Sequence, residues 1–167
     1  MVRTLLVISL LALVAVPAAA QNYGDGFGVG GVFVPDGTGL IVVKTRLGNS
    51  LGVEASASLS TFSNDGSSST DLALGIAAQK FWSTDDRLQP YFGGRFEIGH
   101  SSVDYDEGDL TRDDGGDSDT TFGIIGVLGA EYFISRRLSV EGEAGVGAHF
   151  GSFSLSTQTR LAAFLYL

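Results

Sequence analysis

A histidine and a serine two positions apart are the residues of this 167-residue chain whose spacing best suits catalysis. In an extended strand His100 and Ser102 point to the same side, and Asp114 follows in the polar segment beyond them. A hydrolase would use the serine as nucleophile, the histidine as its base and the carboxylate to orient the histidine. The plainer interpretation is an amphipathic ring at the end of a strand, followed by a loop serine. Because no surrounding hydrolase motif accompanies the pair, we expect no catalytic site.

Carboxylates crowd the segment from Ser101 to Ser118, where seven of them face one cation, Arg112. Six aspartates are candidate ligands for Ca²⁺ or Mg²⁺: Asp104, Asp106, Asp109, Asp113, Asp114 and Asp117. Oxygen-rich loops hold such ions, but the calcium-loop register that ends in a glutamate at its twelfth position is absent. Runs of like charge are more often solvated. We therefore expect a solvated acidic loop, with no bound metal and no cofactor.

The composition excludes several classes of protein. The chain has no cysteine, so disulfides, thiolate metal sites and cysteine nucleophiles are excluded. A net charge of −9 and a pI near 4.4 argue against nucleic acid as a partner, because phosphates attract Lys and Arg. A hydrophobic fraction of 44% and a mean hydropathy of +0.22 exclude a disordered chain. The length suits a single folded domain.

The first 20 residues have the pattern of a secretory signal peptide. A positive start at Arg3 precedes an apolar stretch from Thr4 to Val16, and the small residues at 18–20 suit a signal peptidase. Cleavage before Gln21 would leave a domain of residues 21–167. The alternative is a short membrane anchor, but the apolar stretch is short for a membrane-spanning helix and no charged flank follows it.

The remaining chain alternates between apolar and polar residues, with no helical stripe of useful length. Leu51 to Leu59 and Leu138 to Ala148 show the alternation most clearly, and Glu141 and Glu143 lie opposite the aliphatic residues of the second segment. We predict eight strands, at 25–34, 39–47, 51–62, 70–82, 88–100, 119–134, 138–150 and 154–167. Most connections are short, but those from Ser63 to Ser69 and from Ser101 to Ser118 are longer and lie at the same end of an up-and-down barrel. This asymmetry is typical of outer-membrane barrels.

Aromatic residues on the apolar face indicate that this face points outward to lipid. They gather near one rim at Phe27, Trp82, Phe92 and Tyr132, and near the long-loop rim at Phe33, Phe62, Phe122 and Phe150. Two such girdles are expected where rings straddle the two lipid–water boundaries. A soluble barrel would instead place its apolar face inside.

The polar face holds small residues and a few charges of both signs, which suits a narrow interior. We expect nine of these charged residues to form an interior network: Lys44, Arg46, Glu54, Arg95, Glu97, Glu131, Glu141, Glu143 and Arg160. Eight strands enclose an interior that side chains just fill, so a wide pore is excluded. The network would hold the barrel together, and the alternative is that it gates a thin ion path.

Three segments resemble the outer membrane protein β-barrel domain family, which includes small OmpA- and OmpX-like barrels. They are Gln89 to Gly94, Gly129 to Phe133, and Leu138 to Glu143. The resemblance implies an all-β, eight-stranded antiparallel transmembrane barrel in the outer membrane of a Gram-negative-type cell. It also implies insertion by a barrel assembly machinery, and the chain departs from the family's frequent terminal Phe by ending in Tyr166-Leu167.

We therefore expect a monomeric outer-membrane barrel with a structural, anchoring or surface-interaction role and no catalysis. Its partners would be outer-membrane lipid and lipopolysaccharide. One alternative is a lipid-facing hydrolase, because His100, Ser102 and Asp114 resemble in outline the site of outer-membrane lipid A deacylases. The other is a soluble, lipocalin-like periplasmic carrier that encloses a ligand with its Leu/Val face.

Overall fold

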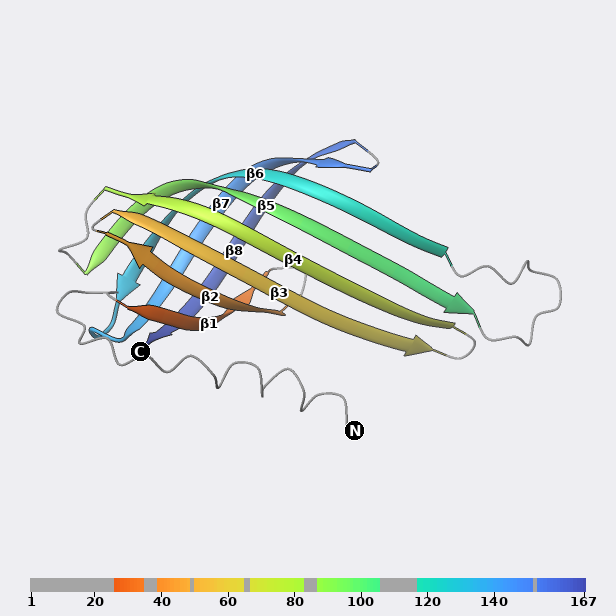
Figure 1. Cartoon of the computed structure of the whole chain (residues 1–167), viewed down its shortest axis with the longest axis horizontal. Coiled ribbons are helices and arrows are strands. Elements are labelled where there is room, and N and C mark those ends of the chain that lie inside the picture. Colours follow the sequence, from red (N-terminus) through yellow and green to blue (C-terminus); the bar gives the residue numbers. More distant parts are fainter. Residues whose placement is uncertain are drawn as a thin grey trace.

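The computed structural model describes residues 26–34, 39–48, 50–64, 67–82, 87–105, 117–151 and 153–167. They form a closed barrel in which each strand pairs antiparallel with the next and the first pairs with the last (Figure 1). The strands are β1 (Phe27–Phe33), β2 (Gly39–Leu47), β3 (Leu51–Asn64), β4 (Ser67–Phe81), β5 (Leu88–Tyr105), β6 (Asp117–Phe133), β7 (Leu138–Phe150) and β8 (Ser154–Tyr166). The prediction of an eight-stranded antiparallel barrel is confirmed. The predicted signal peptide lies outside the described residues. Within them, no helix is long and apolar enough to cross a membrane.

The side-chain alternation determines which residues face the interior. Along β7, Ser139 and Glu141 are buried, whereas Leu138 and Val140 are exposed on the outside. The barrel therefore has its polar face inside and its aliphatic face outside, the reverse of a soluble barrel.

The predicted ends of four strands are wrong. The segments from Ser63 to Ser69 and from Ser101 to Ser118 were expected to be loops. In the structure β3 and β4 run on to a pair between Asn64 and Ser67, and β5 and β6 to a pair between Val103 and Asp117. Backbone pairing in an antiparallel ladder does not depend on apolar side chains, so polar strands can extend a hairpin into water. β2 and β7 begin and end as predicted.

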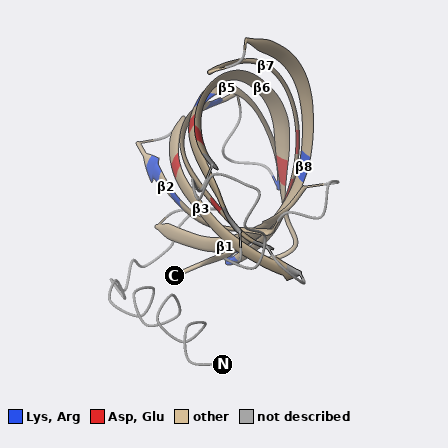
Figure 2. Ribbon diagram, turned by 90° about the vertical axis from the view of Figure 1, so that its right-hand side faces the viewer, with Lys and Arg blue, Asp and Glu red and all other residues tan. Residues whose placement is uncertain are grey.

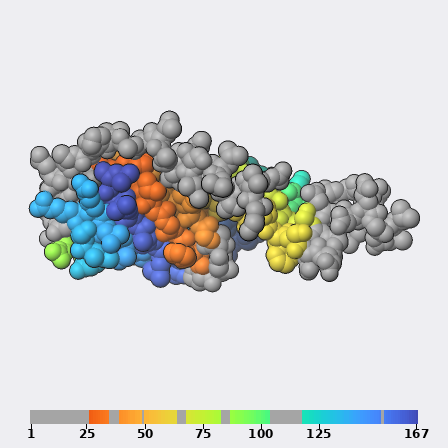
Figure 3. Space-filling view, turned by 90° about the horizontal axis from the view of Figure 1, so that it is seen from below, coloured from red at the N-terminus to blue at the C-terminus, as the bar shows by residue number. Residues whose placement is uncertain are grey.

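The barrel wall is uneven in height. β1 and β2 have 7 and 9 residues, whereas β3, β4, β5 and β6 have 14, 15, 18 and 17. The β1–β2 hairpin stops part-way along the barrel while β3 to β6 continue beyond it (Figure 1). From below, the orange surface of β1 and β2 also ends well short of the yellow tip of β3 and β4 (Figure 3).

The pairing register defines the tilt of the strands. A circuit perpendicular to the strands passes through Gly30, Val42, Ser56, Gly75, Glu97, Gly123, His149 and Ser154. Ser154 precedes Ala162 by eight residues, and Ala162 pairs with Val32 of β1. Continued along β1, the circuit therefore returns ten residues above Gly30, where it started. For eight strands this stagger corresponds to a tilt of about 40°.

Aromatic rings lie at both ends of the outer wall. At the short-turn end, the rings of Trp82 and Phe92 pack with their centroids 5.6 Å apart, and Tyr132 is exposed nearby on β6. At the other end, Phe122 and Phe150 are exposed on the outer face. The prediction that Phe62 belongs to the outer aromatic girdle is wrong. Phe62 shares the inward side of β3 with Glu54 and Ser56 and is not part of the outer apolar face.

Candidate functional site: the barrel interior

Lys44 of β2 is the centre of the charged interior. Its Nζ lies 2.5 Å from a carboxylate oxygen of Glu141 and 3.0 Å from one of Glu131, and all three side chains are fully buried. A short β2 therefore contributes the cation that neutralises two carboxylates from β6 and β7. Removal of one member of such a buried group leaves a charge without a partner, which is strongly unfavourable.

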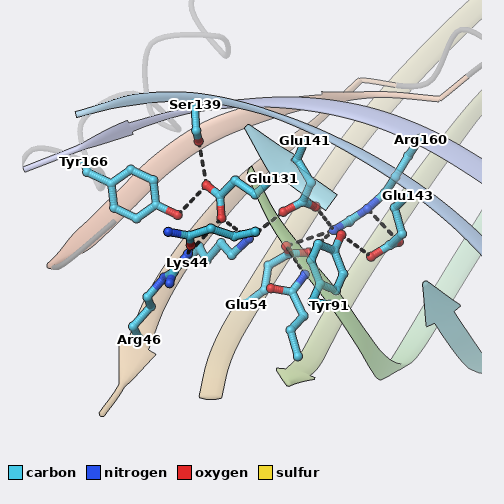
Figure 4. Close-up of polar contacts among 12 residues, drawn as sticks. Lys44, Arg46, Glu54, Tyr91, Glu131, Ser139, Glu141, Glu143, Arg160 and Tyr166 are labelled. Carbon is cyan, nitrogen blue, oxygen red and sulfur yellow. Dashed lines mark hydrogen bonds and ion pairs between the residues drawn. The ribbon is translucent and has the colours of Figure 1, made fainter. Parts of the chain in front are cut away.

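Arg160 of β8 connects this group to a second cluster higher in the barrel. Its guanidinium lies 2.7 Å from a carboxylate oxygen of Glu54, 3.2 Å from one of Glu141 and 2.9 Å from one of Glu143. Arg95 of β5 also contacts Glu143, at 2.6 Å. Charges from β2, β3, β5, β6, β7 and β8 thus meet inside the barrel. Figure 2 marks the charged positions on the strands, and Figure 4 shows the contacts among the residues that it labels.

Inward aromatic rings surround Lys44, and the sequence analysis missed them. The Nζ lies 5.2, 5.3 and 5.0 Å from the ring centres of Phe81, Tyr91 and Phe164, distances at which a cation is attracted to an aromatic face. Each ring falls on the polar side of its strand. The parity of β5 counted from Arg95 and that of β8 counted from Arg160 could have identified Tyr91 and Phe164 as inward. On β4 the outward Lys80 would have placed Phe81 on the wrong face.

Two tyrosine hydroxyls tie the rings to the carboxylates. Tyr91 donates a hydrogen bond to Glu143 at 3.0 Å, and Tyr166 donates one to Glu131 at 2.8 Å (Figure 4). Ser139 also donates to Glu131, at 2.6 Å. The carboxylate of Glu131 is therefore held by two cations and two hydroxyls, which satisfies its buried oxygens.

The short-turn end of the interior is closed by a further polar layer. Arg46 donates a hydrogen bond to Gln89 and lies 3.4 Å from Glu131. Its guanidinium also stacks 4.2 Å above the ring centre of Phe81. Side chains thus fill the barrel from this rim up to the cluster around Arg160.

Glu97 differs from the other eight members of the predicted network. Its only ion pair among the described residues is a 3.8 Å contact with Arg95, and its side chain is 30% exposed, whereas those of Glu54, Glu131, Glu141 and Glu143 are at most 2% exposed. The nine residues comprise four cations and five carboxylates. Glu97 is therefore the carboxylate left with the weakest neutralisation. That the network holds the barrel together stays a prediction.

A cavity of about 400 Å³ lies directly above the charged layers. It is lined by Val34, Leu40, Ser56, Ser58, Ala73, Leu74, Glu97, Thr157, Gln158 and Thr159. The inward residues Ser56, Ser58 and Ala73 leave this space, because their side chains are too small to meet across the barrel.

His100 and Ser102 do not form a catalytic pair with an acid among the described residues. Both lie on the outer side of β5, and the Nδ1 atom of His100 is 3.0 Å from the hydroxyl of Thr120. Asp114 lies outside the described residues, as do Asp106, Asp109 and Asp113. Asp104 falls in β5 and Asp117 begins β6. No group of metal-binding side chains occurs in the described part of the chain.

Comparison with solved structures finds small outer-membrane barrels. A major outer membrane protein from Thermus thermophilus aligns with a TM-score of 0.56 at 18% identity, covering 84% of this chain and 98% of that one. The N-terminal β-barrel domain of Pseudomonas aeruginosa OprF aligns with a TM-score of 0.54 at 11% identity, covering 88% of this chain and 100% of that one. Ail, the attachment invasion locus protein of Yersinia pestis, aligns with a TM-score of 0.53 at 9% identity, covering 84% of this chain and 93% of that one.

This chain has the fold of the small eight-stranded outer-membrane barrels. No protein-family model matches the sequence, and no curated protein matches it. The outward aliphatic wall of this barrel, with exposed residues such as Ile124, Leu128 and Leu161, is a lipid-facing surface. Fold and wall together assign the chain to the outer membrane, and the soluble-carrier alternative is wrong because its aliphatic face would lie inside.

Proposed function

We propose that this outer-membrane barrel is a closed, non-enzymatic protein that acts at the cell surface. The observation that carries the proposal is the division of the molecule into a filled lower barrel and a strand extension beyond it. Lys44, Arg160 and the aromatic rings fill the lower interior, so solutes have no wide path through it. β3 to β6 extend past the end of the β1–β2 hairpin and present polar residues to water.

The height of the apolar wall supports this placement of the extension. Tyr132 and Phe122 are ten residues apart on β6, a distance of about 33 Å along the strand. Because the strand is tilted, this corresponds to a height of about 25 Å along the barrel axis, which equals the usual apolar band of such barrels. β5 continues from the level of Phe122, paired with Ile98, for seven more residues to Tyr105. The proposed surface element is this extension, and its neighbours would be lipopolysaccharide molecules.

A surface role also agrees with one of the structural neighbours, whose name describes an attachment protein of Yersinia pestis. That resemblance concerns the fold alone. The assembly machinery would recognise the last strand, where Leu161, Leu165 and Leu167 alternate on the outer face. We expect the folded barrel to be a monomer.

Two experiments test the proposal. In planar bilayers the purified barrel should show no steady conductance, and a stable open channel would contradict the closed barrel. A shortened variant would replace residues 101–119 with Asn-Gly, a sequence that suits a two-residue hairpin turn between His100 and Thr120. Cells that display this variant at the same level as the parent should attach less well to surfaces coated with basic or acidic proteins. Equal attachment to every coating would overturn the surface role.

A further inference from the structure

The cavity above the charged layers lies beside a stretch of the barrel wall where, among the described residues, two strand edges are unpaired, and we call this stretch the gap. β2 pairs with β3 only from Leu51 to Ala57, and β1 pairs with β8 only from Leu161 to Tyr166. Among the described residues, β3 beyond Ala57 and β8 before Leu161 have no pairing partner on the sides that face each other across the β1–β2 hairpin. Three consecutive residues of β8, from Thr157 to Thr159, line the cavity, as happens when a strand presents its edge.

The pairing register sets the depth of this gap in the membrane. Phe33, at the end of β1, is connected through Leu161 and Gly142 to Ala130 of β6. Ala130 lies eight residues below Phe122, which is about 20 Å along the barrel axis. Because the strands are tilted, the three steps from β6 through β7 and β8 to β1 raise the level by about 10 Å. The hairpin therefore ends about 10 Å below the upper aromatic girdle, so the gap lies within the outer lipid leaflet.

Unpaired strand edges at this depth need polar partners. Hydrocarbon cannot accept or donate hydrogen bonds, so an exposed sheet edge inside the apolar band is strongly unfavourable. The outer sides of the same two edges are aliphatic, with Leu59 61% and Leu155 74% exposed. The gap thus combines hydrogen-bonding groups at its edges with apolar residues that face acyl chains.

The interior behind the gap attracts positive charge. Above Arg95 and Arg160, the inward side chains that the structure describes include the carboxylates Glu97, Asp71 and Asp119 and no Lys or Arg. Glu97 lines the cavity, and its one ion pair within the described part of the chain is the 3.8 Å contact with Arg95, whose guanidinium already lies 2.6 Å from Glu143. Ser56, Ser58 and Gln158 add neutral hydrogen-bonding groups.

We propose that the cavity binds a membrane amphiphile with an ammonium head group, which enters sideways between β3 and β8. The head group lies beside Glu97, and the aliphatic chain stays in the outer leaflet along Leu59 and Leu155. A charge-assisted hydrogen bond to the carboxylate selects ammonium over neutral or anionic head groups. This site is separate from the surface extension, so the two proposals can fail independently.

The test is native mass spectrometry of the full barrel in maltoside micelles, titrated with dodecylamine, which is an ammonium at neutral pH. One dodecylammonium per barrel should bind saturably, about tenfold more tightly than dodecyl sulfate. Glu97→Gln should weaken binding by about tenfold, because it removes the charge and keeps the shape. Ser58→Phe should abolish binding by filling the cavity, and Ser68→Phe on the exposed outer side of β4 is its matched control.

Each other outcome overturns the proposal. Dodecylammonium that binds without saturation, or binds Glu97→Gln as well as the parent, would show that Glu97 does not form the site. If 2-aminoethanol, which has the head group without the chain, binds as tightly as dodecylammonium, the site is one for a soluble cation and not for an amphiphile. Circular dichroism of each variant confirms that the barrel is folded before binding is measured.

Discussion

Lys44 and Glu141 lie 97 positions apart in the sequence, yet the lysine Nζ is 2.5 Å from the carboxylate in the middle of the barrel. The contact joins β2, one of the shortest strands, to β7 across the interior. It is one link in a chain of charges that runs from Arg46 at the short-turn rim to Glu97 in the wall of the cavity. The lower barrel is thereby filled and the upper barrel left open.

Loss of the Lys44 charge should destabilise the barrel strongly. Lys44→Met keeps the length of the side chain but leaves Glu131 and Glu141 without their cation, and we expect a loss of about 3–5 kcal/mol in the free energy of unfolding. Urea unfolding in lipid vesicles measures it. Lys80→Met is the matched control, because Lys80 is exposed on the outside and contacts Ser50. A loss below about 1 kcal/mol for Lys44→Met would show that the network does not hold the barrel together.

The Tyr91 hydroxyl should contribute measurably through its hydrogen bond to Glu143. Tyr91→Phe removes the donor from a fully buried site, and we expect a loss of about 1.5–3 kcal/mol, as for a hydrogen bond to a charged group. Tyr132→Phe makes the same chemical change on the outer wall and should have little effect on stability. Equal unfolding midpoints for the two variants would contradict the role assigned to the hydroxyl.

A glycine in β1 should not tolerate even a methyl group. A Cβ on Gly30 would lie 2.2 Å from the backbone oxygen of Ala163 and 2.7 Å from the ring of Phe164, so the β1–β8 closure would have to shift. We expect Gly30→Ala to cost about 1–3 kcal/mol. Gly39→Ala is the control, since nothing lies within 4 Å of its added Cβ. If the two variants unfold at the same urea concentration, β1 and β8 do not approach as closely as the structure indicates.

Charge on the outer wall should be tolerated according to depth. Leu128 lies between Tyr132 and Phe122 on the outside of β6 and is 58% exposed. Leu128→Arg places a cation near the middle of the apolar band and should cost about 2–4 kcal/mol in vesicles. Leu88, which pairs with Tyr132 at the rim, provides the control, and Leu88→Arg should cost about 0–1 kcal/mol. Equal costs at the two positions would contradict the lipid-facing orientation of the wall.

Strand alternation allowed most of the fold to be predicted, and its failures have physical causes. β2 and β7 have the predicted bounds because aliphatic alternation continues to their ends. The ends of β4 and β5 were missed, because Ser67 to Thr70 and Ser101 to Tyr105 are largely polar in sequence. Paired backbone in water needs no apolar face, so a polar composition does not distinguish such an extension from a loop.

The sequence by itself determined the strand number, the polar and apolar faces and the charged residues of the interior, because these depend only on a period of two along each strand. Tertiary structure alone decided which charges meet, since the Lys44–Glu141 contact depends on the ten-residue stagger of the closed register. It also decided that, among the described residues, the edges of β3 and β8 above the short β1–β2 hairpin are unpaired beside the cavity that Glu97 lines. Pairing between distant strands sets where each side chain lies in height, and no local pattern contains that information.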